Sequence, residues 1–255
     1  MKRRDAFSLT ELLVLLPVIA MLGALLLAPL DSAKQTLQGA QCLSNLRQWG
    51  LALALYANDN QDYTPYGGSG NGYPINTPPN DGAWFNVIPH YINQPSLRDL
   101  YTSTPPRIPL PGTRSVYICP SALPGSQGNL GTDVNNPCYV YQINRVLNGA
   151  LAACPNNLYK RIKVALPGQV VFMCDSDLAG GSTYPFTDGG FLAGSNQPRH
   201  HGGDNFVFVD GHAAWESSSV YSNGFPAGTA NANSEWITPR QIYWFPCKTC
   251  DKRCP

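Results

Sequence analysis

An uninterrupted apolar run dominates the first part of the chain. Residues 12–30 carry no charged side chain and consist mainly of Leu, Ala, Val, Ile and Met. A helix rises about 1.5 Å per residue, so about 20 apolar residues cross the hydrocarbon core of a membrane. The pattern therefore predicts a transmembrane helix over residues 7–30. Lys2, Arg3 and Arg4 precede the run, which predicts a cytoplasmic N-terminus and export of the rest of the chain.

Helical periodicity continues beyond the apolar run. Apolar side chains recur at steps of three and four residues and so share one face of a helix: Cys42, Leu46, Trp49, Leu53 and Tyr56. We therefore predict that residues 31–58 extend the same helix as an amphipathic half, and that a domain packs on this face. Asn58-Asp59-Asn60 supplies a plausible end to the helix.

Residues 59–255 have the pattern of an α+β head with large loops. Gly and Pro number 24 and 23, and they concentrate in turn-rich stretches such as residues 59–83. Short strand-like runs follow a helical or turn segment at 84–101, and they cover residues 116–119, 139–143, 170–174, 206–209 and 212–215. Asp210-Gly211 between the last two runs is a two-residue hairpin sequence. We therefore expect an antiparallel sheet against which the long helix packs.

Charge and cysteine content narrow the function and the compartment. The formal net charge of +1 offers no basic surface for a nucleic acid. In an exported domain an even number of cysteines, here eight, favours disulfides, although sequence leaves the pairing open. The disulfide candidates are Cys42, Cys119, Cys138, Cys154, Cys247, Cys250 and Cys254. A Cys42–Cys119 bridge is reasonable because Cys42 lies on the helix face that meets the head, and a buried free thiol is the alternative.

Histidines and aspartates near the predicted hairpin form the only polar cluster with potential chemistry. Imidazole and carboxylate groups together suit a divalent metal such as zinc, and the candidates are Asp175, His200, Asp210 and His212. A simpler interpretation is that Asp210-Gly211 makes the turn while the histidines hydrogen-bond to loop backbone. The chain lacks Gly-x-Ser-x-Gly and His-Glu-x-x-His sequences. We therefore expect no enzymatic activity and no required cofactor.

The residues around the start of the apolar run resemble the N-terminus of type IV prepilins. These residues are Ala6, Phe7, Ser8-Leu9-Thr10 and Glu11, followed by the long apolar helix. The resemblance implies that residues 1–6 are a leader, cleaved between Ala6 and Phe7 by a prepilin peptidase, with methylation of the new amine. It also implies that Glu11 receives the N-terminal amine of a neighbouring subunit. An ordinary signal peptide or uncleaved anchor is the alternative, but it explains neither Glu11 nor the length of the run.

Two further stretches and a spaced motif extend the resemblance over most of the chain. They are Cys42-Leu43-Ser44-Asn45-Leu46-Arg47-Gln48, then Tyr117-Ile118-Cys119-Pro120-Ser121, and His200 followed after nine residues by Asp210-Gly211. Together they resemble the prepilin-type family that carries a "histidine, nine residues, Asp-Gly" motif near the C-terminus. This family implies a pilin-like architecture, with a role in a filament or a secretion apparatus.

The resemblance leads to a specific expectation of function. The chain is expected to be a structural subunit, a pseudopilin or minor pilin, of a type IV pilus-like or type II secretion-like filament. Its partners would be other pilin-like subunits and the prepilin peptidase. It would cross the inner membrane once, with a periplasmic head that becomes extracellular after assembly. The alternative is a singly anchored envelope protein whose head binds a ligand such as a glycan, and a metal-dependent hydrolase ranks third.

Overall fold

The fold is described by a computed structural model in which two compact units are distinguished, Met1–Leu37 and Gln38–Pro255. Within helix α1 the side chains of residues 23–30 lie outside the description. The residues that the structure describes are 8–68, 74–110, 112–122, 132–133, 136–137, 140–147, 159–175, 186–187, 199–222, 235–236 and 239–246.

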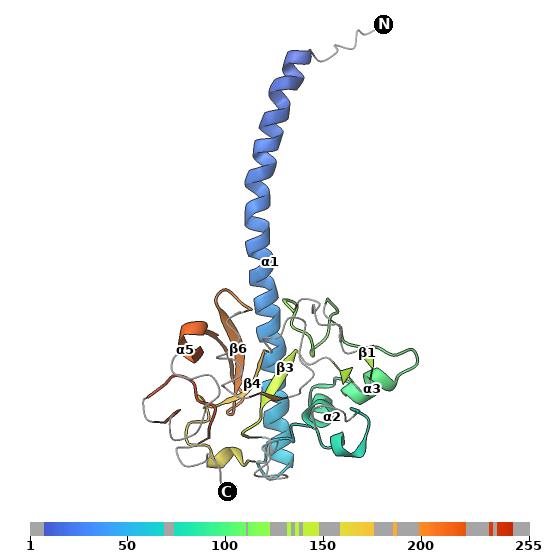
Figure 1. The fold of residues 1–255 in the computed structure, drawn as a ribbon, viewed down its shortest axis with the longest axis vertical. Helices are drawn as coiled ribbons and strands as arrows, with labels where there is room; N and C mark the ends of the chain where they lie inside the picture. Colours follow the sequence, from blue (N-terminus) through green and yellow to red (C-terminus); the bar gives the residue numbers. More distant parts are fainter. Residues whose placement is uncertain are drawn as a thin grey trace. The chain divides into compact units, whose positions relative to one another are not determined.

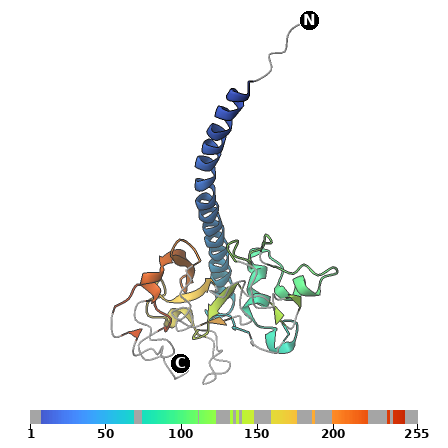
Figure 2. The ribbon, with the colours of Figure 1, turned by 45° about the horizontal axis from the view of Figure 1, so that its top comes forward.

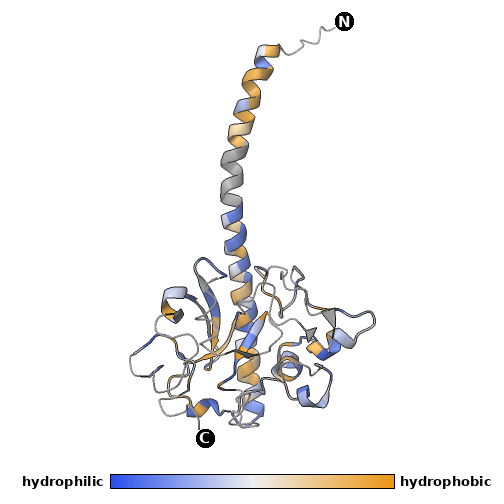
Figure 3. Ribbon diagram, in the orientation of Figure 1, coloured by the Kyte–Doolittle hydropathy of each residue, from blue (hydrophilic) through white to orange (hydrophobic). Residues whose placement is uncertain are grey.

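The long N-terminal helix expected from the sequence is present as α1 (Leu9–Asp59), which is 51 residues long. Large apolar side chains between residues 9 and 22 are exposed on every face, and this stretch is mostly coloured as hydrophobic in Figure 3. No helix in the described part of the chain is both long enough and apolar enough to span a membrane. The predicted leader, Phe7, and the side chains of residues 23–30 in the predicted span lie outside the described residues.

From Gln38 onward α1 belongs to the larger unit, and one of its faces is buried there. Cys42, Leu46, Trp49 and Leu53 are completely buried, whereas Leu51 on another face is 54% exposed. The buried face is the one that the three- and four-residue spacing predicted. In Figures 1 and 2, α2 (Trp84–Val87) and α3 (Leu97–Thr102) lie on one side of this part of α1, with β4 (Val171–Asp175) and β6 (Gly203–Phe208) on the other.

The larger unit contains a five-stranded sheet in the order β5-β3-β4-β6-β7. Four neighbouring strands pair antiparallel, as expected: β3 (Tyr141–Asn144), β4 (Val171–Asp175), β6 (Gly203–Phe208) and β7 (Ala213–Ser217). The fifth, β5 (Phe186–Thr187), pairs parallel to β3, which the sequence did not predict. A separate two-stranded sheet joins β1 (Thr132–Asp133) and β2 (Asn136–Pro137). The described elements thus form an α+β fold.

Short helices complete the described elements. They are η1 (Pro78–Asn80), η2 (Ile88–Ile92), η3 (Arg161–Lys163) and α5 (Ser218–Ser222). The strand expected over residues 116–119 is wrong, because these residues form a turn followed by irregular backbone. The carbonyls of Val116 and Ile118 accept hydrogen bonds from side chains of α1 instead of from a neighbouring strand, as described below.

The sheet is apolar on both faces because its side chains alternate between two cores. Val207 and Val209 join the core that contains the buried face of α1, while Phe206 and Phe208 join a second core with Trp244. Alternate strand residues point to opposite faces, which produces this division. Sheet burial on two sides explains why the strand runs appeared apolar throughout in the sequence.

The turn between β6 and β7 lies directly against α1. Gly211 has a φ of +96°, a conformation that glycine adopts without steric cost. A Cβ atom added to Gly50 would lie 2.1 Å from the carbonyl oxygen of Gly211, far inside van der Waals contact. The Asp210-Gly211 turn and Gly50 therefore permit close approach of the helix and the hairpin.

Candidate functional site: a buried cysteine, aspartate and histidine cluster

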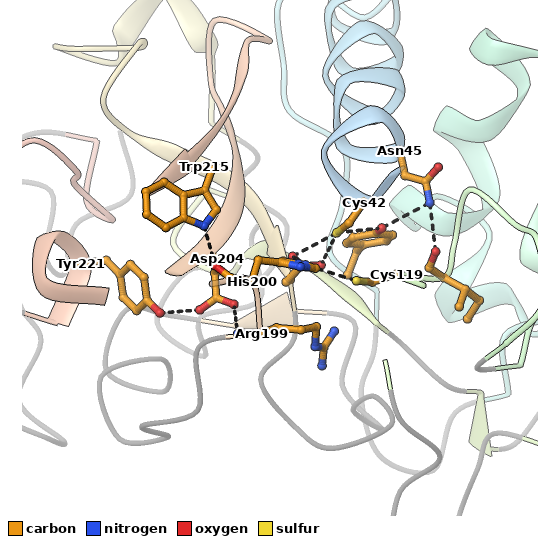
Figure 4. Close-up of polar contacts among 11 residues, drawn as sticks. Cys42, Asn45, Cys119, Arg199, His200, Asp204, Trp215 and Tyr221 are labelled. Atoms are coloured by element: carbon orange, nitrogen blue, oxygen red, sulfur yellow. Dashed lines mark hydrogen bonds and ion pairs between the residues drawn. The ribbon is translucent and has the colours of Figure 1, made fainter. Parts of the chain in front are cut away.

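Four side chains with metal-binding chemistry meet in the interior of the larger unit. Cys42 comes from α1, Cys119 from the turns after α3, Asp175 from the end of β4, and His200 from the residues before β6. Their potential ligand atoms all lie within 4.8 Å of one another, and no residue of the set is more than 3% exposed. Figure 4 shows the side chains of Cys42, Cys119 and His200 converging at the helix. We call this set the buried cluster.

Short polar contacts link the members of the buried cluster. The Cys42 thiol donates to both carboxylate oxygens of Asp175 at 3.1 Å. The Nε2 atom of His200 lies 3.1 Å from Asp175 Oδ2 and 3.3 Å from Cys119 Sγ. The Tyr141 hydroxyl donates to Cys42 Sγ at 3.3 Å. These contacts join all four members of the cluster through Asp175 and His200.

Polar side chains on α1 place Cys119 in the cluster. Asn45 Nδ2 donates to the Ile118 carbonyl at 2.9 Å, and Trp49 Nε1 donates to the Val116 carbonyl at 3.0 Å. One turn before Cys42, Gln38 Nε2 donates to the Pro120 carbonyl at 3.1 Å. Residues spaced by about one or two helical turns therefore hold the backbone on both sides of Cys119 against the same face that carries Cys42.

A tight turn aims His200 inward. His200 and Gly203 exchange two backbone hydrogen bonds of 2.8 and 3.0 Å. The intervening residues His201 and Gly202 have φ values of 48° and 80°, the positive values that a type I′ turn requires. Trp215 Nε1 donates to the His200 carbonyl at 2.7 Å, which further fixes the backbone. The imidazole consequently faces Asp175 and Cys119.

A second buried carboxylate supports the residues around this turn. Asp204 accepts a hydrogen bond from the Arg199 backbone amide at 3.0 Å and another from the Tyr221 hydroxyl. Figure 4 places this pair beside His200 but apart from the two cysteines. Burial, together with the nearby Asp175 charge, raises the pKa of Asp204 despite these hydrogen bonds. Asp204 therefore serves to position the turn and does not join the cluster.

The buried cluster strongly perturbs its own acid–base chemistry. Burial raises the pKa of Cys42 well above its ordinary value, and Cys119 and Asp175 raise it further. Burial also raises the pKa of Cys119, but the contacts with Cys42 and His200 outweigh it and lower this pKa to about 6. For His200, burial lowers the pKa, while the hydrogen bonds to Asp175 and Cys119 outweigh it and raise the pKa to about 10. At neutral pH these shifts favour a Cys119 thiolate beside a protonated His200.

The structure divides the four metal candidates named from the sequence into two pairs. Asp175 and His200 meet in the buried cluster, 3.1 Å apart. Asp210 and His212 do not join them, since Asp210 Oδ1 lies 2.6 Å from His212 Nδ1 on the exposed hairpin. The ring of His212 also stacks on Phe208 at 4.5 Å. The expectation of one site made by all four residues is therefore wrong, because the second pair is satisfied within its own turn.

The cysteines also differ from the preferred expectation. Within the described part of the chain, Cys42, Cys119 and Cys174 are buried and form no disulfide, so the expected Cys42–Cys119 bridge is absent and the alternative of an unbridged thiol holds for Cys42. The other disulfide candidates, Cys138, Cys154, Cys247, Cys250 and Cys254, lie outside the described residues. Sequence reasoning separated the cysteines from the histidine cluster, although the helix face of Cys42 was the signal that could have joined them.

Glu11 has a local partner that the sequence analysis overlooked. Its carboxylate accepts hydrogen bonds of 2.8 Å from both the backbone amide and the hydroxyl of Ser8. In return, the Ser8 hydroxyl accepts from the Glu11 amide at 3.3 Å. This reciprocal pair is a capping box, and its Ser-x-x-Glu spacing was readable in the sequence. Ala6 and Phe7, the predicted processing residues, lie outside the described part of the chain.

Comparisons with known proteins return no match to a family model, a curated protein or a solved structure. The resemblance to prepilin-type proteins therefore depends on the residue motifs alone.

Proposed function

We propose that this protein is a pilin-like subunit that assembles into a filament through the N-terminal half of α1. The observation that carries the proposal is the exposure of apolar side chains all around residues 9–22 of that helix. Leu9, Leu13 and Met21 are 79%, 68% and 69% exposed, and the other large apolar side chains between them are at least half exposed. A helix that is apolar all round requires cover by lipid or by other helices.

The amount of apolar surface makes this cover energetically important. Each buried Leu, Val, Ile or Met side chain contributes roughly 1.5–3 kcal/mol relative to exposure in water. The chain supplies no partner for these side chains within the first unit, as far as the described residues go. In the proposed assembly, copies of the same helix are first held in a membrane and then bundled. Each copy then buries its apolar side chains against the apolar side chains of its neighbours. This supports a homotypic or pilin-like heterotypic assembly.

The negative charge of Glu11 is what supports a filament subunit over a lone membrane anchor. The capping role of Glu11 does not distinguish the two. A capping box with Ser8 would serve an isolated helix equally well. Glutamine satisfies the same box, whereas only a carboxylate can also pair with an amine. In the proposed assembly, the Phe7 amine freed by processing is placed beside the Glu11 carboxylate of a neighbouring subunit.

Processing is the first test of this function. We expect the mature protein to begin at Phe7, because Ala6-Phe7 and Glu11 are arranged as in a prepilin cut site. The measurement is N-terminal mass spectrometry of protein extracted from membranes of cells that contain a prepilin peptidase. Ala6→Gly should keep this start, while Ala6→Arg should leave the leader attached because it replaces the small residue before the cut. A wild-type protein that starts at Met1, or beyond residue 30, would contradict the proposal.

A further inference from the structure

We propose that Cys42, Cys119, Asp175 and His200 bind one Zn²⁺ ion that fastens α1 to the head. The donor set comprises two sulfurs, one imidazole nitrogen and one carboxylate, all of which zinc accepts in four-coordinate structural sites. Sulfur and imidazole donors also disfavour Mg²⁺ and Ca²⁺, which prefer oxygen ligands. The inference concerns the larger unit alone and does not depend on filament assembly.

The separations between donor atoms suit a tetrahedral ion. Zinc binds sulfur at about 2.3 Å and nitrogen or oxygen at about 2.0–2.2 Å, so the edges of its ligand tetrahedron measure roughly 3.3–3.8 Å. Cys42 Sγ and His200 Nε2 each lie 3.1 Å from Asp175, and Cys119 Sγ lies 3.3 Å from Nε2. An outward movement of about half an ångström per edge accommodates the ion.

The charge of the cluster is compatible with a divalent ion. A carboxylate that is only 1% exposed lies beside the completely buried Cys42 and the buried His200. A divalent cation would take the place of the protons on the thiol and imidazole donors, and the binding free energy would become part of the stability of the fold.

The location of the cluster points to a structural and not a catalytic ion. Catalytic zinc keeps an open position for water or substrate, whereas structural zinc is enclosed by four protein ligands. Here all four donors belong to residues that are at most 3% exposed. They also come from four separate segments: the helix, the turns after α3, β4 and the turn before β6. One ion would therefore cross-link the helix to both sides of the head.

The competing use of the two cysteines is a disulfide. The sulfur atoms lie within 4.8 Å, so a modest movement could bring them to the bonded distance of about 2.05 Å. In the structure the two sulfurs contact each other, and the Cys42 sulfur also contacts Asp175 while the Cys119 sulfur also contacts His200. A bridge would leave Asp175 and His200 without these contacts, whereas an ion uses all four residues.

Metal titration of the full chain, purified in detergent and stripped by a chelator, tests the proposal. We expect one Zn²⁺ per chain, and one Co²⁺ that gives the visible bands of tetrahedral cobalt with thiolate charge-transfer absorption. Cys42→Ser and His200→Gln should each weaken binding at least about 10–100-fold, because even changes beyond the ligands have effects of this size. The matched controls Cys174→Ser, a buried thiol in the other core, and His212→Gln, an exposed histidine, should bind as the wild type does.

Several outcomes would overturn the zinc site. One is a wild-type chain that binds no stoichiometric Zn²⁺ or Co²⁺ after reduction. Another is equal loss of binding in the control variants, which would place the ion elsewhere. The third is a Cys42–Cys119 disulfide found by non-reducing peptide mapping of protein taken from the cell envelope. If a ligand variant fails to fold, the cobalt spectrum of the wild type still tests whether the ion is tetrahedral and bound by thiolate.

Discussion

Glu11→Gln should give a protein that is processed and folded but enters filaments at least about tenfold less efficiently than the wild type. In the proposed bundle the Glu11 carboxylate of one subunit pairs with the Phe7 amine of the next. Glutamine leaves that amine uncompensated among apolar helices, and an unsatisfied buried polar group costs roughly 1–3 kcal/mol, or more when charged. A difference of about 1.4 kcal/mol is tenfold in an equilibrium constant.

The Glu11→Gln substitution separates the charge from the capping box. Glutamine at this position still caps the helix, because its side-chain oxygen can accept the hydrogen bonds from Ser8 that the Glu11 carboxylate accepts. The matched control is Ser8→Ala, which removes the capping hydroxyl but retains the carboxylate, and it should assemble nearly as well as the wild type. The measurement is co-assembly of tagged variants with wild-type subunits in sheared surface fractions. Normal incorporation of Glu11→Gln would remove the charge-based reason to prefer a filament subunit.

Gly50→Ala should destabilise the larger unit by about 2–3 kcal/mol, within the range for overpacking against a rigid neighbour. The added methyl group would lie 2.1 Å from the carbonyl oxygen of Gly211 and 3.2 Å from a methyl group of Val207. Backbone cannot rotate away as a side chain can, so the β6–β7 hairpin must move off the helix. This cost exceeds the roughly 1 kcal/mol that alanine gains over glycine in a helix.

Gly39→Ala is the matched control for this close approach. It is the same substitution in the same helix, but the nearest atom, Nδ1 of His200, would be at an ordinary contact distance of 3.5 Å. We therefore expect Gly39→Ala to be neutral or stabilising by up to about 1 kcal/mol. Chemical denaturation followed by tryptophan fluorescence measures both, since Trp49 is buried beside Gly50. Equal effects from the two variants would contradict a specific helix–hairpin contact.

The elements with strong periodicity or turn chemistry could be predicted from the sequence. The spacing of Cys42, Leu46, Trp49 and Leu53 correctly identified the buried face of α1. Asp210-Gly211 correctly marked the turn between β6 and β7, because few dipeptides adopt its backbone conformation so readily. Helical periodicity and turn sequences depend only on residues that are close in the chain, so they can be recognised before the fold is known.

The errors arose where distant contacts decide the structure. Residues 116–119 have the apolar character of a strand, but Asn45 and Trp49 of α1 donate hydrogen bonds to the carbonyls of Ile118 and Val116. A short apolar run carries no information about which partner satisfies its backbone. The two-residue strand β5 is equally invisible, because its pairing with β3 is a tertiary contact.

The candidate site was half predictable for the same reason. Asp175 and His200 were named from the sequence, but they were grouped with Asp210 and His212 because imidazole and carboxylate groups together suit a divalent metal. Those two residues instead pair with each other across a single turn. Their places in the cluster are taken by Cys42 and Cys119, which are separated from Asp175 by 133 residues and from His200 by 81 residues, respectively. Only the packing of α1 and of distant head segments against one another brings such residues together.

Photo-crosslinking from the N-terminal half of α1 tests the proposed filament subunit most directly. A photoreactive residue at Leu16, which is 60% exposed within the apolar stretch, should yield a ladder of cross-linked copies in cells that produce the protein. The matched control carries the photoreactive residue in place of Ile162, which is 83% exposed and belongs to the larger unit. The account predicts ladders from Leu16 that disappear with Glu11→Gln. Cross-links from Leu16 to lipid alone, with no joined copies, would contradict it.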